Sequence, residues 1–461
     1  MDIKITGGRI LTAEKTLKAE IAVRNGTIAA IAPSIDAVAG RTIDATGMIV
    51  MPGVIDAHVH FQMPSAVTVT ADDFEGGTKA AACGGVTTVI DFAIQRKGRT
   101  LREAVELRRA EADGKVVIDY SLHAVPTDWN SQTRKEIEKT VISGITTFKA
   151  YMAYEREGLM LDDNSLLELM QAVGRCGAMV TVHAESAPIL NVGRRRYHNV
   201  ESMRLFGAFC HALSRPKIAE NEATQRAAIY SGIAECPIYI VHMSSGAGAG
   251  ILNNARSQDF AVYGETCPHY LILDNSVFLD RNGHLYATCP PLREHKDSER
   301  LWQGITDGDI QVVATDSCTF TKKQKARWKG DFSRIPCGMP GVETLLPLMY
   351  TYGVGKKKIT ENQLVRVLCE NPARLMGFFP KKGSISVGAD ADLVIFDPGK
   401  RITISHKNLR MNCDWSPYEG FKVKGYPHLT ISRGEVVAED GKFVGKAGHG
   451  RFVKRGMPSP V

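Results

Sequence analysis

The sequence predicts an α/β protein with a (β/α)8 TIM-like barrel and a small β-sandwich domain formed from both chain termini. Two observations support this. Eight apolar, β-branched runs alternate with helical stretches through the middle of the 461-residue chain, and both ends instead show short alternating runs separated by turns. Alternation of strands and helices indicates a parallel sheet, and eight strands can close a barrel. A doubly wound open sheet is the alternative.

The sequence pattern at both chain ends is typical of small β-sheets. From Ile3 to Val50, apolar and polar residues alternate between glycine-containing turns, and Asn25-Gly26 is a strong hairpin signal. We therefore expect a small antiparallel sheet there. The tail from Gly383 repeats the pattern, with a turn at Arg433-Gly434. The predicted domains are a β-sandwich of residues 1–52 plus 383–461 and a barrel of residues 53–382.

The predicted barrel strands are short runs rich in Val, Ile and other apolar residues. They are Met48–Val54, Thr87–Phe92, Val116–Val125, Thr146–Met152, Met179–His183, Pro237–Met243, Ala261–Glu265 and Ile310–Thr315. Between them lie stretches that we expect to be helical, namely Leu101–Ala112, Asp163–Arg175 and Glu220–Ala234.

The composition limits the class of protein. With 44% hydrophobic and 23% charged residues, the chain resembles an ordinary globular protein rather than a disordered one. No run approaches the ~18 apolar residues of a membrane span, and the first residues lack a signal-peptide pattern. Ten cysteines without a CxxC pair indicate reduced thiols, and the short basic runs behind the net charge of +7 indicate solvated loops or a subunit interface. We expect a cytoplasmic enzyme that binds neither membrane nor nucleic acid.

Metal-binding side chains stand at the ends of several predicted strands. His58 and His60 are two residues apart after the first run, so both can reach the same side. The others are Lys149, His183, His242 and Asp316. The carboxyl ends of barrel strands share one mouth, where catalytic groups collect. A lone histidine there is more often part of the core, but five of the eight strand ends carry these residue types, which favours a metal site.

Lys149 needs a separate explanation, because a protonated amine does not bind a cation. Carboxylation by CO2 would convert it to N6-carboxylysine, an anionic carbamate with two oxygens. Such a group can bridge two divalent ions, and imidazole and carboxylate ligands suit Zn²⁺. We therefore expect two metal ions, with zinc as the expected metal.

These residues resemble the hydantoinase/dihydropyrimidinase family of the amidohydrolase superfamily, over essentially the whole chain. The resemblance rests on PGVIDAHVH at 52–60, GGVTTVIDF at 84–92, FKAYMAY at 148–154, ETCPHY at 265–270 and GADADLV at 388–394. It implies that one zinc is held by His58, His60 and Asp316 and the other by His183 and His242, with carboxylated Lys149 as the bridge. The family opens cyclic amides, such as hydantoins and dihydropyrimidines, to N-carbamoyl amino acids. It generally forms homotetramers, so we expect a homo-oligomer, either a tetramer or a dimer.

The resemblance also implies catalytic roles for two residues. A hydroxide activated by the two metals attacks the ring carbonyl, and Asp316 moves the proton from this water to the departing ring nitrogen. The hydroxyl of Tyr154, five residues beyond Lys149, contacts the substrate and stabilises the developing oxyanion. Without the resemblance, a packed aromatic side chain is an equally good interpretation of Tyr154.

Three positions depart from the family pattern. Cys289 and Cys337 stand where the family usually has Ser and Asn in contact with the cyclic amide, and Ser317 stands where many members have His. Thiols are poor hydrogen-bond donors. The substrate can therefore differ from an ordinary hydantoin or dihydropyrimidine, and hydrolysis of a different cyclic amide is one alternative function.

The residues after the histidine pair separate this chain from two related enzymes. Dihydroorotase and allantoinase carry an arginine there, whereas here Phe61 and Met63 follow, either as an apolar rim for an uncharged ring or as packing. A non-catalytic scaffold protein related to dihydropyrimidinase is a further possible function. Retention of all six metal-binding residues favours the enzyme over the scaffold.

Overall fold

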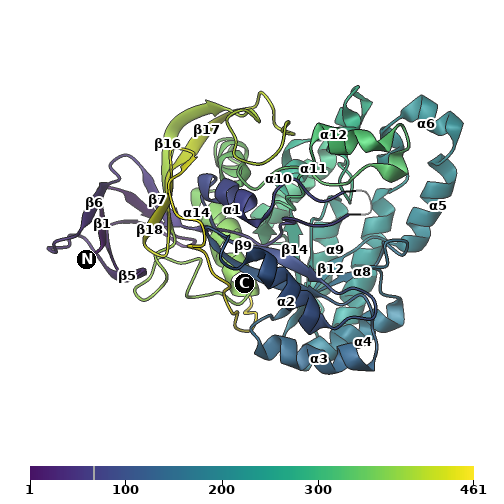
Figure 1. The fold of residues 1–461 in the computed structure, drawn as a ribbon, viewed down its shortest axis with the longest axis horizontal. Helices are drawn as coiled ribbons and strands as arrows, with labels where there is room; N and C mark the ends of the chain where they lie inside the picture. Colours follow the sequence, from purple (N-terminus) through teal and green to yellow (C-terminus); the bar gives the residue numbers. More distant parts are fainter. Residues whose placement is uncertain (66–67) are drawn as a thin grey trace.

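The computed structural model describes residues 1–65 and 68–461 and contains the predicted barrel (Figure 1). Its parallel strands follow one another in chain order, from β8 at one edge to β15 at the other. They are β8 (Val54–Asp56), β9 (Val86–Ile94), β10 (Asp119–Val125), β11 (Thr147–Tyr151), β12 (Met179–His183), β13 (Ile238–Ile240), β14 (Val262–Thr266) and β15 (Val312–Val313). The carbonyl of Ser317, just beyond β15, accepts a hydrogen bond from the His60 backbone N–H at 2.9 Å. The barrel is thus nearly closed, not an open doubly wound sheet.

Helices surround this sheet. They are α1 (Phe74–Cys83), α2 (Leu101–Ala112), α3 (Ser131–Ile142), α4 (Asp163–Gly174), α5 (Ala187–Tyr197), α6 (Val200–Phe206), α7 (Phe209–Leu213), α8 (Lys217–Ala234), α9 (Ala247–Arg256), α10 (Pro268–Ile272), α11 (His295–Asp307), α12 (Lys322–Lys325), α13 (Leu345–Leu348), α14 (Glu361–Val365) and α15 (Asn371–Leu375). The three predicted helices are confirmed as α2, α4 and α8. The start of α2 is fixed by a capping box, in which Thr100 and Glu103 bond each other's backbone N–H.

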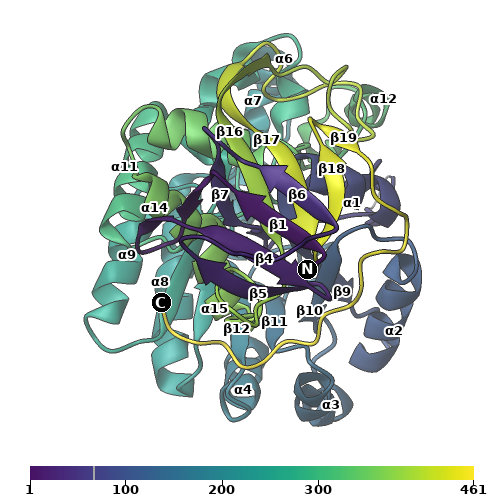
Figure 2. The ribbon, with the colours of Figure 1, turned by 90° about the vertical axis from the view of Figure 1, so that its left-hand side faces the viewer.

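Two further sheets lie beside the barrel (Figure 2). The first has the order β5-β4-β1-β6 and the second the order β19-β18-β17-β16-β7-β2-β3. Their strands are β1 (Ile3–Thr6), β2 (Arg9–Leu11), β3 (Thr16–Lys18), β4 (Glu20–Arg24), β5 (Thr27–Ala32), β6 (Arg41–Asp44), β7 (Ile49–Pro52), β16 (Leu393–Thr403), β17 (Lys422–Ser432), β18 (Glu435–Glu439) and β19 (Lys442–Phe443). Because β16 pairs with β7, both chain ends contribute to the second sheet, as predicted.

Two details of the prediction are wrong. The N-terminal region is not purely antiparallel, because β1 pairs in parallel with β6 and β2 in parallel with β7. The run Met48–Val54 is not one barrel strand either: β7 ends in the sandwich sheet and β8 begins in the barrel. Gly53 separates them and packs so closely that a Cβ atom there would lie 2.1 Å from Thr87 Oγ1. The hairpin is confirmed, with positive φ at Asn25 (50°) and Gly26 (74°).

The C-terminal segment closes one end of the barrel. In Figure 2 it runs as a yellow coil beneath β10, β11 and β12. Arg455 is buried there and donates to the Leu122 carbonyl at 2.5 Å and to Thr147 Oγ1 at 2.8 Å. This end holds the amino termini of the strands, so the opposite end, where the strands finish, is left for a site.

A buried ionic cluster joins the barrel to the sandwich. Lys382, 1% exposed, lies 2.7 Å from Asp119 of β10 and 2.6 Å from Asp392, which precedes β16. Arg433 adds a second cation, 3.1 Å from Asp119. Buried carboxylates of this kind depend on their paired cations, since removal of one partner leaves uncompensated charge.

We therefore expect Lys382→Met to lower the free energy of unfolding by about 3–5 kcal/mol, measured by urea denaturation. Lys18→Met is the matched control, because Lys18 is an exposed residue of β3 in the sandwich. Equal losses of stability in the two variants would contradict a special role for the buried cluster.

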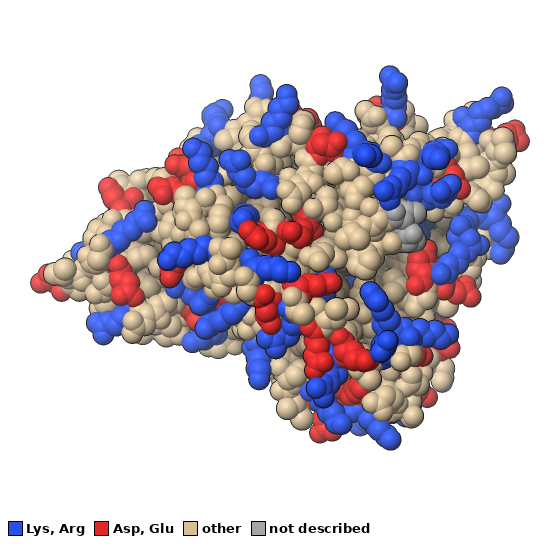
Figure 3. Space-filling model, viewed as in Figure 1, with Lys and Arg blue, Asp and Glu red and all other residues tan. Residues whose placement is uncertain are grey.

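Charged residues of both signs cover the surface. On the face shown in Figure 3, Lys and Arg side chains are interspersed with Asp and Glu over both the barrel and the sandwich. Within residues 1–65 and 68–461, no helix is both long enough and apolar enough to cross a membrane.

Candidate metal centre and active-site cavity

One cavity of about 620 Å³ lies at the carboxyl ends of the barrel strands. All of the predicted metal ligands line it: His58, His60, Lys149, His183, His242 and Asp316. Tyr154, Cys289 and Cys337, the predicted substrate contacts, line the same cavity. The structure therefore brings together every residue that the sequence indicated for the site.

His58, His60 and Asp316 form the first group of candidate ligands. The Nε2 atoms of His58 and His60 are 3.3 Å and 3.1 Å from Asp316 Oδ1. His58 Nδ1 faces Glu265 Oε1 at 2.7 Å and donates to this carboxylate, so its Nε2 lone pair is directed at the Asp316 carboxylate. The imidazole nitrogens and the carboxylate oxygen are acceptors that face one another, which suits a cation between them. Imidazole and carboxylate are both ligand types that divalent zinc takes.

His183 and His242 form the second group. His183 is the last residue of β12, His242 lies two residues beyond β13, and His183 Nδ1 is 2.9 Å from His242 Nε2. The rings of His242 and His58 are 5.4 Å apart, so the two groups adjoin. Burial lowers the pKa of His58 and of His242 well below the ordinary value, so both rings are neutral at physiological pH, as metal ligation requires.

Lys149 lies in β11 and is 1% exposed. Its Nζ is 5.3 Å from the ring centre of Phe92 and 5.2 Å from that of Tyr151. Among the residues that the structure describes, no carboxylate lies within ion-pair distance of it. Burial lowers the pKa of Lys149 to about 7. Much of the amine is therefore unprotonated at neutral pH, which is the form that can react with CO2.

Tyr154 follows β11 in a turn with a positive φ of 71°. Its ring lies 4.9 Å from that of His183, and the Arg215 guanidinium lies 5.5 Å from its ring centre. Burial raises the pKa of Tyr154 well above the ordinary value, so the hydroxyl keeps its proton and can donate it in a hydrogen bond. Tyr154 lines the cavity, with its ring against that of His183.

Asp316 is the one carboxylate among the six predicted metal ligands. Burial raises its pKa, but His58 and His60 outweigh this effect and hold the pKa at about 2. The group is therefore ionised throughout the neutral range, which both ligation and acceptance of a proton require.

Three further residues support the site and are not indicated by the sequence analysis. Glu265, at the end of β14, orients His58 and also accepts a hydrogen bond from the Tyr239 hydroxyl at 2.8 Å. Glu185 lies 2.7 Å from His183 Nε2 and is paired with Arg215. Both glutamates could have been found by the rule that identified the ligands, since they stand at or just after strand ends. Arg215 lies between helices and carries no such signal.

The positions that depart from the family pattern have different surroundings. Cys289 is buried and Cys337 half-buried, and both face the cavity. Ser317 connects the segment after β15 to the loop that contains Gly341, because its hydroxyl accepts a hydrogen bond from the Gly341 backbone N–H at 3.2 Å. Of the two residues after the histidine pair, Met63 lines the cavity, whereas Phe61 is 1% exposed and packs in the core.

Comparison with known proteins agrees with this arrangement. The amidohydrolase family profile matches residues 49–437. A D-hydantoinase from Geobacillus stearothermophilus is 41% identical over 98% of this chain and 96% of the relative. A D-phenylhydantoinase from Escherichia coli is 39% identical over 99% of this chain and 98% of the relative. The crystal structure of a dihydropyrimidinase from Brevibacillus agri superposes with a TM-score of 0.97 at 38% identity, covering 100% of both chains.

Proposed function

Because the chain belongs to the hydantoinase/dihydropyrimidinase family of the amidohydrolase superfamily, we propose that it hydrolyses the ring amide of a hydantoin, a dihydropyrimidine or a related cyclic imide or ureide. The product is the corresponding N-carbamoyl amino acid. The observation that carries this proposal is the convergence of four histidines, one lysine and one aspartate in a single cavity.

The donor set suits two divalent cations. His58, His60 and Asp316 would hold one, His183 and His242 would hold the other, and Lys149 as a carbamate would join them. Two such cations supply a nucleophile from water at neutral pH and polarise the carbonyl. The buried, partly neutral amine of Lys149 supports this assignment because it has no counter-ion among the described residues.

The remaining chemistry is assigned to two side chains. Asp316, ionised at neutral pH, takes the proton of the attacking water and returns it to the ring nitrogen as the amide bond breaks. Tyr154, whose hydroxyl stays protonated, donates a hydrogen bond to the carbonyl oxygen as negative charge develops there.

Tyr154→Phe is expected to lower kcat about 100-fold to 1000-fold, because it removes one donor to the oxyanion while preserving the ring. Steady-state kinetics on a hydantoin measure this change. Tyr230→Phe, on the half-exposed surface of α8, is the control and should leave kcat unchanged. A Tyr154→Phe enzyme with wild-type kcat would show that Tyr154 is only a packing residue.

Cys289 and Cys337 favour a second candidate substrate class. Their thiols stand at the wall of the cavity and are poor hydrogen-bond partners. A cyclic amide with a less polar edge needs fewer hydrogen bonds there and would therefore lose less binding free energy than an ordinary hydantoin. Hydrolysis of dihydrouracil, hydantoin and 5-phenylhydantoin by purified, zinc-loaded protein tests this. Turnover of all three at similar rates would argue against any influence of the two cysteines.

Two features of the whole protein complete the proposal. We propose division into a sandwich of residues 1–52 plus 383–461 and a barrel of residues 53–382. The membership of the sheets supports this division as far as Phe443, whereas the segment beyond Phe443 packs against the barrel strands. We also propose a homo-oligomer, a tetramer or a dimer, on family grounds. Exposed apolar side chains such as Val192, Leu205 and Ile233 on α5, α6 and α8 support this.

A further inference from the structure

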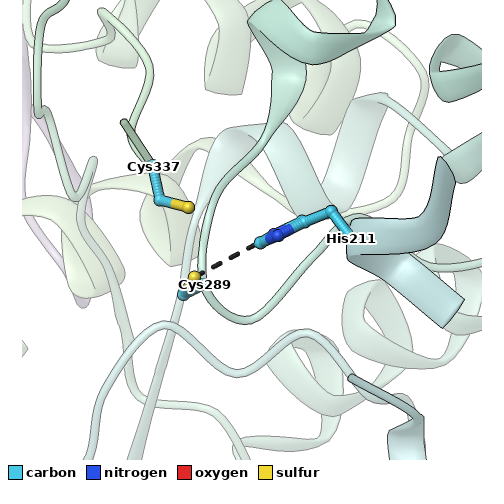
Figure 4. Close-up of side chains that lie close together, drawn as sticks. All are labelled: His211, Cys289 and Cys337. Atoms are coloured by element: carbon cyan, nitrogen blue, oxygen red, sulfur yellow. Dashed lines mark hydrogen bonds between the residues drawn. The ribbon is translucent and has the colours of Figure 1, made fainter. Parts of the chain in front are cut away.

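A second group of potential metal ligands lies in the wall of the same cavity. His211, Cys289 and Cys337 point toward one another (Figure 4), and their ligand atoms all lie within 4.8 Å of one another. Cys289 Sγ is 4.0 Å from His211 Nε2. None of these side chains belongs to the six proposed ligands of the catalytic centre.

The three residues come from separate parts of the barrel. His211 lies in α7, whereas Cys289 and Cys337 lie in two loops that follow β14 and β15. The loop carrying Cys337 is held by the Cys318 thiol, which donates to the Cys337 carbonyl at 3.7 Å. The imidazole of His211 is only 4% exposed. The group therefore consists of buried and half-buried side chains that are held in place, rather than of exposed surface side chains.

Two thiols and one imidazole form a soft donor set, which selects zinc-group cations over magnesium or calcium. Cys289 and Cys337 also border the catalytic cavity, and all three residues border an adjoining cavity of about 290 Å³. A fourth coordination position would thus be open, as in zinc sites with three protein ligands. We propose that His211, Cys289 and Cys337 form a third metal site, for a soft divalent cation such as Zn²⁺ or Cd²⁺.

The protonation of the group fits this role. A hydrogen bond from the Cys337 thiol lowers the pKa of Cys289 well below the ordinary value, although burial opposes this, and the charge of Arg215 acts in the same direction. Both effects favour the thiolate form of Cys289, which is the form that binds metals. His211 Nε2 donates to the Thr288 carbonyl at 2.9 Å, so ligation by this nitrogen would replace that hydrogen bond and place the ring proton on Nδ1.

Occupancy of this site has a consequence that rests on the proposed function. The thiols face the space in which the cyclic amide would lie, so a cation bound to them would obstruct the substrate. Excess soft cation is then expected to inhibit hydrolysis, and a chelator is expected to reverse the inhibition while the two catalytic ions remain bound.

The test is a titration with Cd²⁺ of the reduced holoprotein loaded with two zinc ions per chain, followed by ultraviolet sulfur-to-cadmium charge-transfer absorption and by metal content. The catalytic ligands offer only nitrogen and oxygen, so this absorption reports thiolate ligation alone. We expect a band that saturates at one Cd²⁺ per chain. It should be lost in Cys289→Ser/Cys337→Ser, weakened in His211→Ala and unchanged in the control Cys176→Ser, which replaces a half-buried cysteine next to α4.

X-ray absorption at the cadmium edge of the wild-type protein gives a measurement that does not depend on the folding of a variant. Two sulfur neighbours are expected. Absence of the band at one equivalent, or a band that persists in the double variant, would overturn the proposal. If the protein hydrolyses no cyclic amide, the proposed function fails, whereas the cadmium band still decides whether the third site exists.

Discussion

Replacement of Lys149 by alanine is expected to abolish hydrolysis and to reduce the metal content of the protein. Lys149 is the residue proposed to join the two metals, and the loss of one metal removes several kcal/mol of transition-state stabilisation, or about 1000-fold or more in rate. Because the side chain is buried without a counter-ion among the described residues, its removal leaves no unpaired carboxylate. The loss should therefore affect function far more than stability.

The measurements are turnover and zinc per chain after loading in the presence of bicarbonate. Lys139→Ala, on the exposed side of α3, is the matched control. This variant should have the turnover and the zinc content of the wild type. A Lys149→Ala protein that binds two zinc ions and turns over normally would rule out the bridging role.

Asp316→Asn is expected to lower kcat about 100-fold to 10,000-fold, the range for loss of a general acid–base group. Asparagine keeps the shape of the side chain but cannot take up the proton of the attacking water. In the wild type the depressed pKa of Asp316, about 2, keeps the carboxylate ionised at every pH above about 4, so its protonation should not limit turnover in the neutral range.

A pH–rate profile together with zinc analysis separates the two roles of Asp316. A variant that keeps its zinc and loses kcat has lost proton transfer, and one that loses zinc has lost a ligand. Asp307→Asn, at the exposed end of α11, is the control. Wild-type kcat in Asp316→Asn would exclude both roles.

Much of the barrel, and the placement of the six candidate ligands in one cavity, could be predicted because both follow a local rule. Buried parallel strands are mostly apolar, so a histidine or aspartate at a strand end is conspicuous, and all strand ends share one mouth. The first strand is the exception, because β7 and β8 on either side of Gly53 are both buried and apolar. Apolar periodicity cannot distinguish one long strand from two strands in different sheets.

The surroundings of the site could not be predicted in the same way. Arg215 reaches Glu185 from a segment between helices, and His211 reaches Cys289 from the short helix α7. Neither position has a pattern that indicates its partner, because these contacts depend on how distant segments pack. In the sequence the two cysteines stand out only as departures from a family pattern, and the structure shows that they lie side by side with an imidazole.

Catalysis by a binuclear centre is the central claim, and a zinc titration of metal-free protein tests it most directly. Hydantoin hydrolysis would be followed in bicarbonate as zinc is added. Activity is expected to rise and to reach a plateau at two zinc ions per chain, before any inhibition by a third. Two bound zinc ions without turnover of any cyclic amide, or full turnover with no bound metal, would contradict the claim.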